Sequence, residues 1–190
     1  MSSRYVAEPL SKTAYVILGM LQLGKRTGYE IKSLVDVSTR FFWAASYGQI
    51  YPEFARLEEA GLIRAEPVES DSRGRKAYQL TDAGEAVLRD WLLSTEPLHM
   101  ELRHEGALKL FFSDALPREE QIEPVRQMRA AHEQVLQQLE GIASDKDADG
   151  ADPGAPRLCL EWGIAYQEFM IDWCSKVERR LAAEPAGKGA

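Results

Sequence analysis

The chain has 190 residues, of which 45% are hydrophobic and 28% are charged, with a net charge of −7 and only two cysteines. This length suits one ordinary domain plus a smaller one, and no apolar run approaches the length that crosses a membrane. Two cysteines indicate a reducing compartment rather than a disulfide scaffold, and nothing resembles a signal peptide. We therefore expect a cytoplasmic protein.

The charge is divided unevenly along the chain. Residues 1–95 contain 12 Lys and Arg and 12 Asp and Glu, whereas residues 96–190 contain 11 and 18. A polyanion repels the acidic half but not the neutral half. This division favours nucleic-acid binding by the amino-terminal half, with a chance distribution of charge as the alternative.

Two short helices are predicted first. A helix over residues 14–23 ends at Gly24. A T-x-x-E capping box at Thr27 then starts a second helix, which runs to about residue 38 and makes Tyr29 available to the core. Together with the third helix described below, they form the helical order of a helix-turn-helix domain.

The connection over residues 39–45 contains three aromatic residues, Phe41, Phe42 and Trp43. Connections are normally solvated, so this composition is unusual. We expect burial under the second domain or a partner subunit. The alternative is that Trp43 forms a wall of an effector pocket.

A third helix begins at Ser46 with an S-x-x-Q capping box. Ile50, Phe54 and Leu57 recur at helical spacing and form one apolar stripe. Gly61 closes the helix by accepting a left-handed conformation.

The opposite face of this helix suits contact with duplex DNA. Gln49 can pair with adenine, and Arg56 with guanine or phosphate. Ser46, Tyr47 and Tyr51 lie near the amino end, where phosphate contacts are favoured. Three glutamates later in the helix limit insertion to its first two turns. The alternative for Gln49 and Arg56 is a solvated face.

A hairpin with a basic tip follows the third helix. Residues 62–70 and 76–80 alternate as two short strands around a tight turn. A capped helix followed by a charged hairpin is the plan of a winged helix-turn-helix domain, whose wing reaches phosphates or the minor groove. The alternative is that the charges only prevent edge-to-edge aggregation. The predicted contacts at the tip are Arg73, Gly74, Arg75 and Lys76.

These motifs resemble the PadR family, named after phenolic acid decarboxylase regulators, over about residues 11–95. The likeness is carried by Gly48-Gln49-Ile50-Tyr51-Pro52, Leu57-Glu58, Gly61-Leu62-Ile63, residues 74–81, Gly84 and Leu88. The resemblance implies a transcriptional regulator, in most cases a repressor released by a small ligand. It implies DNA contact for Ser46, Tyr47, Gln49, Tyr51, Arg73, Arg75 and Lys76. The long second half is similar to the larger subgroup, which has a helical dimerisation domain.

Thr81 caps a fourth helix, whose Trp91 and Leu92 are expected to face inward. The Ser-Thr-Glu-Pro segment that ends at Pro97 then breaks the pattern. We predict a DNA-binding domain over residues 1–95 and a helical dimerisation and effector domain over residues 96–190.

The second domain is predicted to contain three helices, over residues 102–114, 117–142 and 157–183. A segment rich in Asp, Gly, Ala and Pro, residues 145–156, is the expected flexible linker. His132 belongs to the apolar seam of the middle helix and is expected in the core or at an interface.

The last helix has two apolar stripes. One contains Leu158, Trp162, Tyr166, Phe169, Trp173 and Val177, and the other contains Leu160, Ile164, Met170 and Cys174. A helix that is apolar on two faces needs two partners, here its own domain and a second subunit. A homodimer would place two recognition helices about 34 Å apart on a pseudo-palindromic operator.

The overall prediction is a mainly α (α+β) protein that acts as a dimeric, sequence-specific DNA-binding regulator. Trp43, Trp162, Tyr166, Phe169 and Trp173 are the candidates for lining a site for an aromatic effector, but plain core packing is the favoured interpretation of each. The alternative function is a winged-helix module for protein–protein interaction. No catalytic motif, cofactor loop or metal-ligand spacing is recognisable, and both cysteines, Cys159 and Cys174, are expected to be buried.

Overall fold

The computed structural model describes residues 10–44, 46–66, 76–98, 100, 102–148 and 154–183. The chain forms two compact units, Met1–Pro97 and Leu98–Ala190, which are treated separately below. None of the helices in these described ranges combines the length and apolar character needed to span a bilayer.

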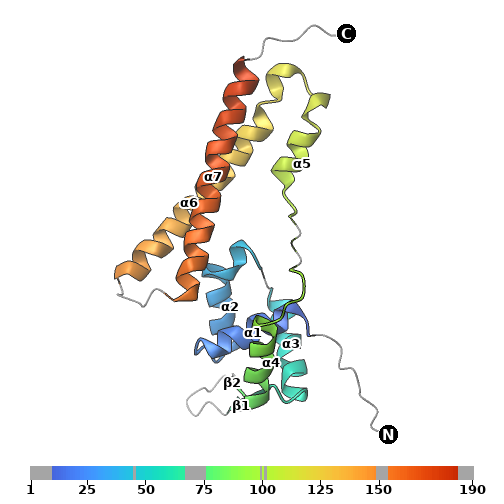
Figure 1. Cartoon of the computed structure of the whole chain (residues 1–190), viewed down its shortest axis with the longest axis vertical. Coiled ribbons are helices and arrows are strands. Elements are labelled where there is room, and N and C mark those ends of the chain that lie inside the picture. The colour runs from blue at the N-terminus through green and yellow to red at the C-terminus, as the bar shows by residue number, and fades with distance from the viewer. Residues whose placement is uncertain are drawn as a thin grey trace. The chain divides into compact units, whose positions relative to one another are not determined.

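The amino-terminal unit is a set of helices with one two-stranded antiparallel sheet (Figure 1). Ile63 pairs with Leu80 and Glu66 with Ala77. The predicted winged-helix class, with its two-stranded wing, is confirmed. The elements are α1 (Lys12–Gln22), α2 (Gly28–Val37), the 3-10 turn η1 (Thr39–Phe41), α3 (Tyr47–Glu59), β1 (Ile63–Glu66), β2 (Ala77–Leu80) and α4 (Asp82–Leu92).

Side-chain caps set where the helices of this unit begin. The Ser11 hydroxyl accepts from the Ala14 amide at 3.1 Å and starts α1 two residues earlier than predicted. At α2, the Thr27 hydroxyl accepts from the Glu30 amide and the Glu30 carboxylate accepts from the Thr27 amide, which completes the predicted capping box. These bonds satisfy amides that have no partner within the helix.

The core of this unit is an apolar cluster contributed by α1, α2, α3, α4 and β1. Ile50, Phe54 and Leu57 of α3 are fully or almost fully buried, as their spacing predicted. Burying a side chain of this size contributes about 1.5–3 kcal/mol each, so the stripe fixes which face of α3 points outward.

The junction between α3, the sheet and α4 is held at two glycines. Gly61 has φ +70°, the predicted left-handed conformation that ends α3. The Thr81 hydroxyl donates to the Gly61 carbonyl at 2.8 Å and accepts from the Gly84 amide at 3.1 Å, so it links the helix end to the α4 start. A Cβ atom at position 84 would lie 2.0 Å from the Leu62 carbonyl oxygen, so only glycine fits there.

The carboxyl-terminal unit consists of helices. Figure 1 shows α6 and α7 side by side in opposite directions, and α5 packs against α6. Val125 and Met128 of α6 and Cys174 of α7 form its buried core. The elements are α5 (Glu105–Phe111), the 3-10 turns η2 (Ser113–Ala115) and η3 (Arg118–Glu120), α6 (Glu123–Ala148) and α7 (Ala155–Ala183).

Several side chains expected in the core of the first unit are exposed. Tyr29 points to solvent, and so do Trp91 and Leu92. Trp91 instead stacks on Tyr15 with ring centroids 4.5 Å apart, while Lys12 lies over both rings. These positions flank the helix stripes, so the neighbouring helices leave them at the edge of the core.

The aromatic connection also differs from expectation. Phe42 and Trp43 are exposed within the chain, and Phe41 is half-buried in η1. The Arg40 guanidinium lies 4.8 Å from the centre of the Phe41 ring. Burial of these rings by a partner subunit stays a prediction.

The helix limits of the second unit are corrected in three places. Helix α5 is shorter than predicted, and α6 begins at Glu123 rather than at residue 117. Proline is favoured in the first turn of a helix, where its missing amide would have no partner in any case, so Pro124 fits a start of α6 at Glu123. The predicted linker 145–156 is also too long, because α6 continues to Ala148 and α7 starts at Ala155.

The two cysteines differ in their surroundings. Cys174 is buried as predicted, whereas Cys159 is exposed, which corrects the prediction. Burial raises the pKa of the Cys174 thiol, which therefore stays protonated at neutral pH.

Replacing Gly84 with alanine tests the close approach of α4 to Leu62. The added methyl group would force the backbones apart, so we expect the free energy of unfolding to fall by about 1–3 kcal/mol. Thermal and urea unfolding followed by circular dichroism measure this. The control is Gly19→Ala in α1, where nothing lies within 4 Å of the added atom and a gain of about 0.5–1 kcal/mol is expected. Equal effects of the two substitutions would contradict the assignment.

Candidate nucleic-acid interface

The first turns of α3 present a solvent-exposed surface made of polar, aromatic and small side chains. Ser46, Tyr47, Gly48, Gln49 and Tyr51 are all exposed. A helix amino terminus carries a partial positive charge and unpaired amide groups, which favour a phosphate oxygen nearby. The surface therefore has the shape and polarity of a helix that meets a nucleic-acid backbone.

Helix α2 supports the two tyrosines of this surface. The rings of Tyr47 and Tyr51 stack with centroids 6.0 Å apart. The Tyr51 ring lies so close to Gly28 of α2 that a Cβ atom there would be 3.1 Å from it. The Lys32 ammonium lies 5.4 Å from the centre of the Tyr47 ring and pairs with Asp36. The tyrosines are thus held in place before any partner arrives.

Gln49 already has a role within the protein. Its side-chain oxygen Oε1 accepts from the Ser46 amide at 3.0 Å and from the Ser46 hydroxyl at 3.2 Å. Paired recognition of adenine would use that same oxygen together with the amide NH₂ group. Gln49 can therefore read a base in this way only if it gives up part of the cap of α3.

Arg56 lies later on the same helix and is engaged by a neighbour. Its guanidinium pairs with the Glu53 carboxylate at 3.4 Å, and the Glu53 side chain is buried. Glu53 is one of the three glutamates that were expected to limit insertion of the helix. Its carboxylate is buried, so it is not exposed to a ligand, and its negative charge is partly balanced by Arg56.

The base of the wing is fastened to α3. Tyr78 of β2 stacks on Phe54 with centroids 4.4 Å apart, and its amide donates to the Arg26 carbonyl at 2.8 Å. Burial raises the pKa of the Tyr78 phenol, so it stays neutral. Lys76 is exposed, and its ammonium lies 3.7 Å from the Glu58 carboxylate.

The other predicted wing residues, Arg73, Gly74 and Arg75, lie outside the described residues. The two strands that carry them are placed, because β1 and β2 pair over their whole described length. The contact of Arg73, Gly74 and Arg75 with DNA stays a prediction.

The residues predicted to bind an effector do not form one enclosed site in either unit. Trp43 belongs to the first unit, whereas Trp162, Tyr166, Phe169 and Trp173 lie on α7 of the second. The Trp162 and Tyr166 rings stack with centroids 6.2 Å apart. Of these five residues, Tyr166 alone is half-buried, and the other four are exposed.

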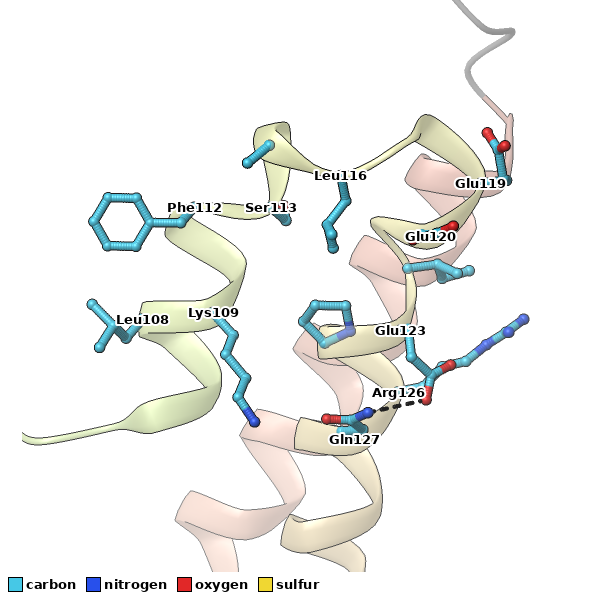
Figure 2. Close-up of a pocket in the computed structure, with 13 residues that line it drawn as sticks. Leu108, Lys109, Phe112, Ser113, Leu116, Glu119, Glu120, Glu123, Arg126 and Gln127 are labelled. Carbon is cyan, nitrogen blue, oxygen red and sulfur yellow. Dashed lines mark hydrogen bonds between the residues drawn. The ribbon is translucent and has the colours of Figure 1, made fainter.

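A groove of about 870 Å³ lies elsewhere in the second unit, between α5 and α6. Figure 2 shows Leu108 of α5 and Phe112, which follows that helix, on one side and Glu123 and Gln127 of α6 on the other. The Gln127 amide donates to the Glu123 carboxylate at 3.3 Å. None of the five predicted effector residues lines this groove.

No group of three or more His, Cys, Asp or Glu side chains within the described ranges is arranged to hold a metal ion. His104 and His132, which lack metal-ligand spacing in sequence, contact each other, and they are considered below.

Comparison with known proteins identifies the family. The sequence model of the Transcriptional regulator PadR-like family matches residues 17–90, and that of the Virulence activator alpha C-term matches residues 102–182. The chain is 33% identical over 170 residues to the negative transcriptional regulator PadR of Bacillus subtilis (strain 168), covering 86% of this chain and 93% of that protein.

The chain belongs to the PadR-like family of transcriptional regulators.

Solved structures of the Bacillus subtilis relative agree with this membership. Its crystal structure in complex with operator DNA has a TM-score of 0.83 and 26% identity, and covers 92% of this chain and 99% of that one. Its crystal structure in complex with p-coumaric acid has a TM-score of 0.75 and 26% identity, with 93% and 100% coverage. As a member of the PadR-like family, the chain is a transcriptional regulator and not an enzyme, as predicted.

Two residues beside the candidate interface of this PadR-like regulator were missed in the sequence. Lys32 lies against Tyr47, and Gly28 allows Tyr51 to pack closely. Both belong to α2, and their spacing within that helix gives no sign of what lies across from it. Only the capping position of Thr27, next to Gly28, marked this region as structured.

Substitution of Lys76 with alanine separates binding from stability. Its pair with Glu58 is exposed, so its loss should cost less than about 1 kcal/mol of unfolding free energy. In DNA titrations, we expect weaker binding and a salt-dependence slope lowered by about one, as for one phosphate contact per site. Lys176→Ala is the matched control, because Lys176 has 64% side-chain exposure and an acidic partner, against 62% for Lys76. An unchanged slope in the Lys76 variant would remove this residue from the interface.

Proposed function

We propose that this PadR-like regulator is a dimeric repressor that binds a pseudo-palindromic operator and is released by a small aromatic acid. In this proposal, residues 1–95 bind DNA, and residues 96–190 join two copies and receive the effector. The observation that carries it is the match, at a TM-score of 0.83 over 92% of this chain, to a relative crystallised with operator DNA.

The DNA contacts are assigned to the start of α3 and the wing. Ser46, Tyr47 and Tyr51 supply hydroxyl donors next to the helix amino terminus. Arg73, Arg75 and Lys76 supply positive charge, and Gly74 lets the turn approach a phosphate. Gln49 and Arg56 are the base-reading candidates, and each must leave an internal partner to act.

Dimerisation is assigned to the uncovered stripe of α7. Leu158, Trp162 and Phe169 are 63%, 58% and 61% exposed within the chain. The other stripe, which includes Leu160 and Cys174, is buried against the rest of the unit. Large apolar side chains gathered on one helix face favour a partner surface, because covering them removes apolar area from water.

Release by an aromatic acid is assigned on the relative's complex. The Bacillus subtilis protein has been crystallised with p-coumaric acid, and this chain carries the stacked pair Trp162 and Tyr166. Trp43, Phe169 and Trp173 complete the proposed aromatic set. An effector that binds one dimer arrangement better than the other shifts the spacing of the two α3 helices away from the operator spacing.

The test of DNA binding uses the purified chain and the DNA upstream of its own gene. We expect binding that falls about 10³-fold between 50 and 200 mM salt if about six phosphates are contacted. The Arg73/Arg75/Lys76→Ala variant should lose most of this affinity while keeping its fold. Adding p-coumaric acid should release the wild-type complex.

Three controls accompany that measurement. An unrelated duplex of equal length reports non-specific binding, a non-aromatic acid reports a simple salt effect, and the Trp162→Leu variant reports the stacking site. Binding to both duplexes with equal affinity would contradict sequence-specific regulation. Release by both acids would contradict a specific aromatic site.

Phe169→Ser tests the dimer surface. Introducing a hydroxyl into the exposed stripe removes apolar contact area, so we expect the dimer, twice the chain mass of 21.3 kDa, to dissociate at micromolar concentration. Light scattering coupled to size-exclusion chromatography measures the mass. Glu168→Ser, at the adjacent exposed position, should remain dimeric. If the Phe169→Ser protein stays dimeric and its DNA binding keeps the wild-type salt dependence, the dimer interface lies elsewhere.

A further inference from the structure

Two histidines and a glutamine form a continuous hydrogen-bonded chain inside the carboxyl-terminal unit. The Ala107 amide donates to Nδ1 of His104 at 3.1 Å. Nε2 of His104 lies 3.1 Å from Nε2 of His132, and Nδ1 of His132 lies 2.5 Å from Oε1 of Gln167. These hydrogen bonds therefore connect the start of α5 to α6 and α6 to α7 through side chains.

This geometry determines where the protons are. Nδ1 of His104 accepts a hydrogen bond, so the proton of the neutral ring must sit on Nε2. His104 then donates to Nε2 of His132, which must be unprotonated. The remaining proton of His132 is on Nδ1 and is donated to Gln167. Each ring nitrogen is therefore either a donor or an acceptor, and all three hydrogen bonds form only when both histidines are neutral.

A second proton on either ring disrupts this series of hydrogen bonds. On His104 it would occupy Nδ1 and face the Ala107 amide, so the cap of α5 would be lost. On His132 it would occupy Nε2 and face the Nε2 proton of His104. In both cases two donors oppose each other. The cost is larger at His132, which is buried, than at the exposed contact between His104 and the Ala107 amide. Binding a shared metal ion would likewise need the proton of His104 on Nδ1, which the cap excludes.

Within the described part of the chain, no carboxylate hydrogen-bonds to the ring of His104 or His132 and could compensate its charge. His132 and Gln167 are buried, and the Tyr166 ring of α7 lies edge-on to His132. On α5, Glu105 pairs with Lys109. On α6 and α7, Arg129 pairs with Glu133 and Glu178.

Burial, and then the neighbouring His132, lower the pKa of His104. The sign follows from linkage. A histidine with a depressed folded-state pKa stabilises the fold above the ordinary value of about 6.5, and this contribution is lost as the pH falls below it.

Helix α5 is weakly held otherwise. It has seven residues, and none of them is buried. It approaches α6 closely at Gly106, where a Cβ atom would lie 3.1 Å from the Met128 side chain, and its half-buried Leu110 packs against the core of the unit. An element with few buried contacts opens locally at low cost, so one cap and one buried hydrogen bond are a large share of what holds it.

We propose that His104, His132 and Gln167 form a pH-sensitive contact that holds α5 against α6 while both histidines are neutral and releases it in acid. Release adds the seven residues of α5 to the chain segment that joins the two units, and it opens one wall of the α5–α6 groove. The contact thus couples proton concentration to the connection between the DNA-binding and carboxyl-terminal units.

Nuclear magnetic resonance of the imidazole nitrogens tests the proton positions in the full-length protein. At pH 7.5 we expect His104 protonated on Nε2 and His132 protonated on Nδ1. Hydrogen exchange of the α5 amides, corrected for intrinsic rates, should rise up to about tenfold at pH 5.5, one unit below the ordinary pKa of a histidine such as His104. Unchanged α5 exchange over this pH range, or His104 protonated on Nδ1 at pH 7.5, would overturn the proposal.

Two variants separate this contact from general acid effects. His104→Asn keeps an N-cap acceptor but does not titrate, so its α5 exchange should be nearly independent of pH. His99→Gln removes the remaining histidine of the chain and should retain the wild-type pH dependence. If His104→Asn keeps the pH dependence of α5 exchange, or His99→Gln abolishes it, the sensor lies elsewhere.

Discussion

The buried stripe of α3 is the constraint on which the amino-terminal unit depends. Ile50, Phe54 and Leu57 have almost no contact with water, so rotating the helix would expose all three at once. This fixes the exposed face and directs the helix start outward. Phe54 also stacks on Tyr78, so the same stripe places the wing relative to the helix. The exposed face of α3 and the base of the wing are thereby held in a fixed relative position.

The carboxyl-terminal unit differs because its own residues cover only one side of α7. Leu160 and Cys174 are buried, whereas Trp162 and Phe169 on another face are exposed. In the proposed dimer, a second copy covers this face and gains the free energy of removing it from water, and the same contact would set the spacing of the two α3 helices.

Internal hydrogen bonds limit what the polar residues can do. Gln49 caps its own helix, Arg56 pairs with a buried glutamate, and His104 caps α5. Each side chain must break an existing hydrogen bond or ion pair before it can contact a base or take up a proton, and breaking it costs free energy. In the functions proposed for this PadR-like regulator, DNA binding, effector binding or protonation uses this competition. Each shifts the populations of conformations that differ by a few kcal/mol.

Local patterns in the sequence determined the recognition helix and its cap, because Ser46, Gln49 and Gly61 act on backbone groups only a few positions away. They also determined that Ile50, Phe54 and Leu57 of α3 are buried, but not that Glu53 is buried with them. Tertiary structure alone decided that Cys159 is exposed, that Lys32 lies on Tyr47, and that histidines 28 positions apart meet. Spacing within a helix defines its faces, but which face is covered, and by which side chain, depends on how neighbouring helices pack.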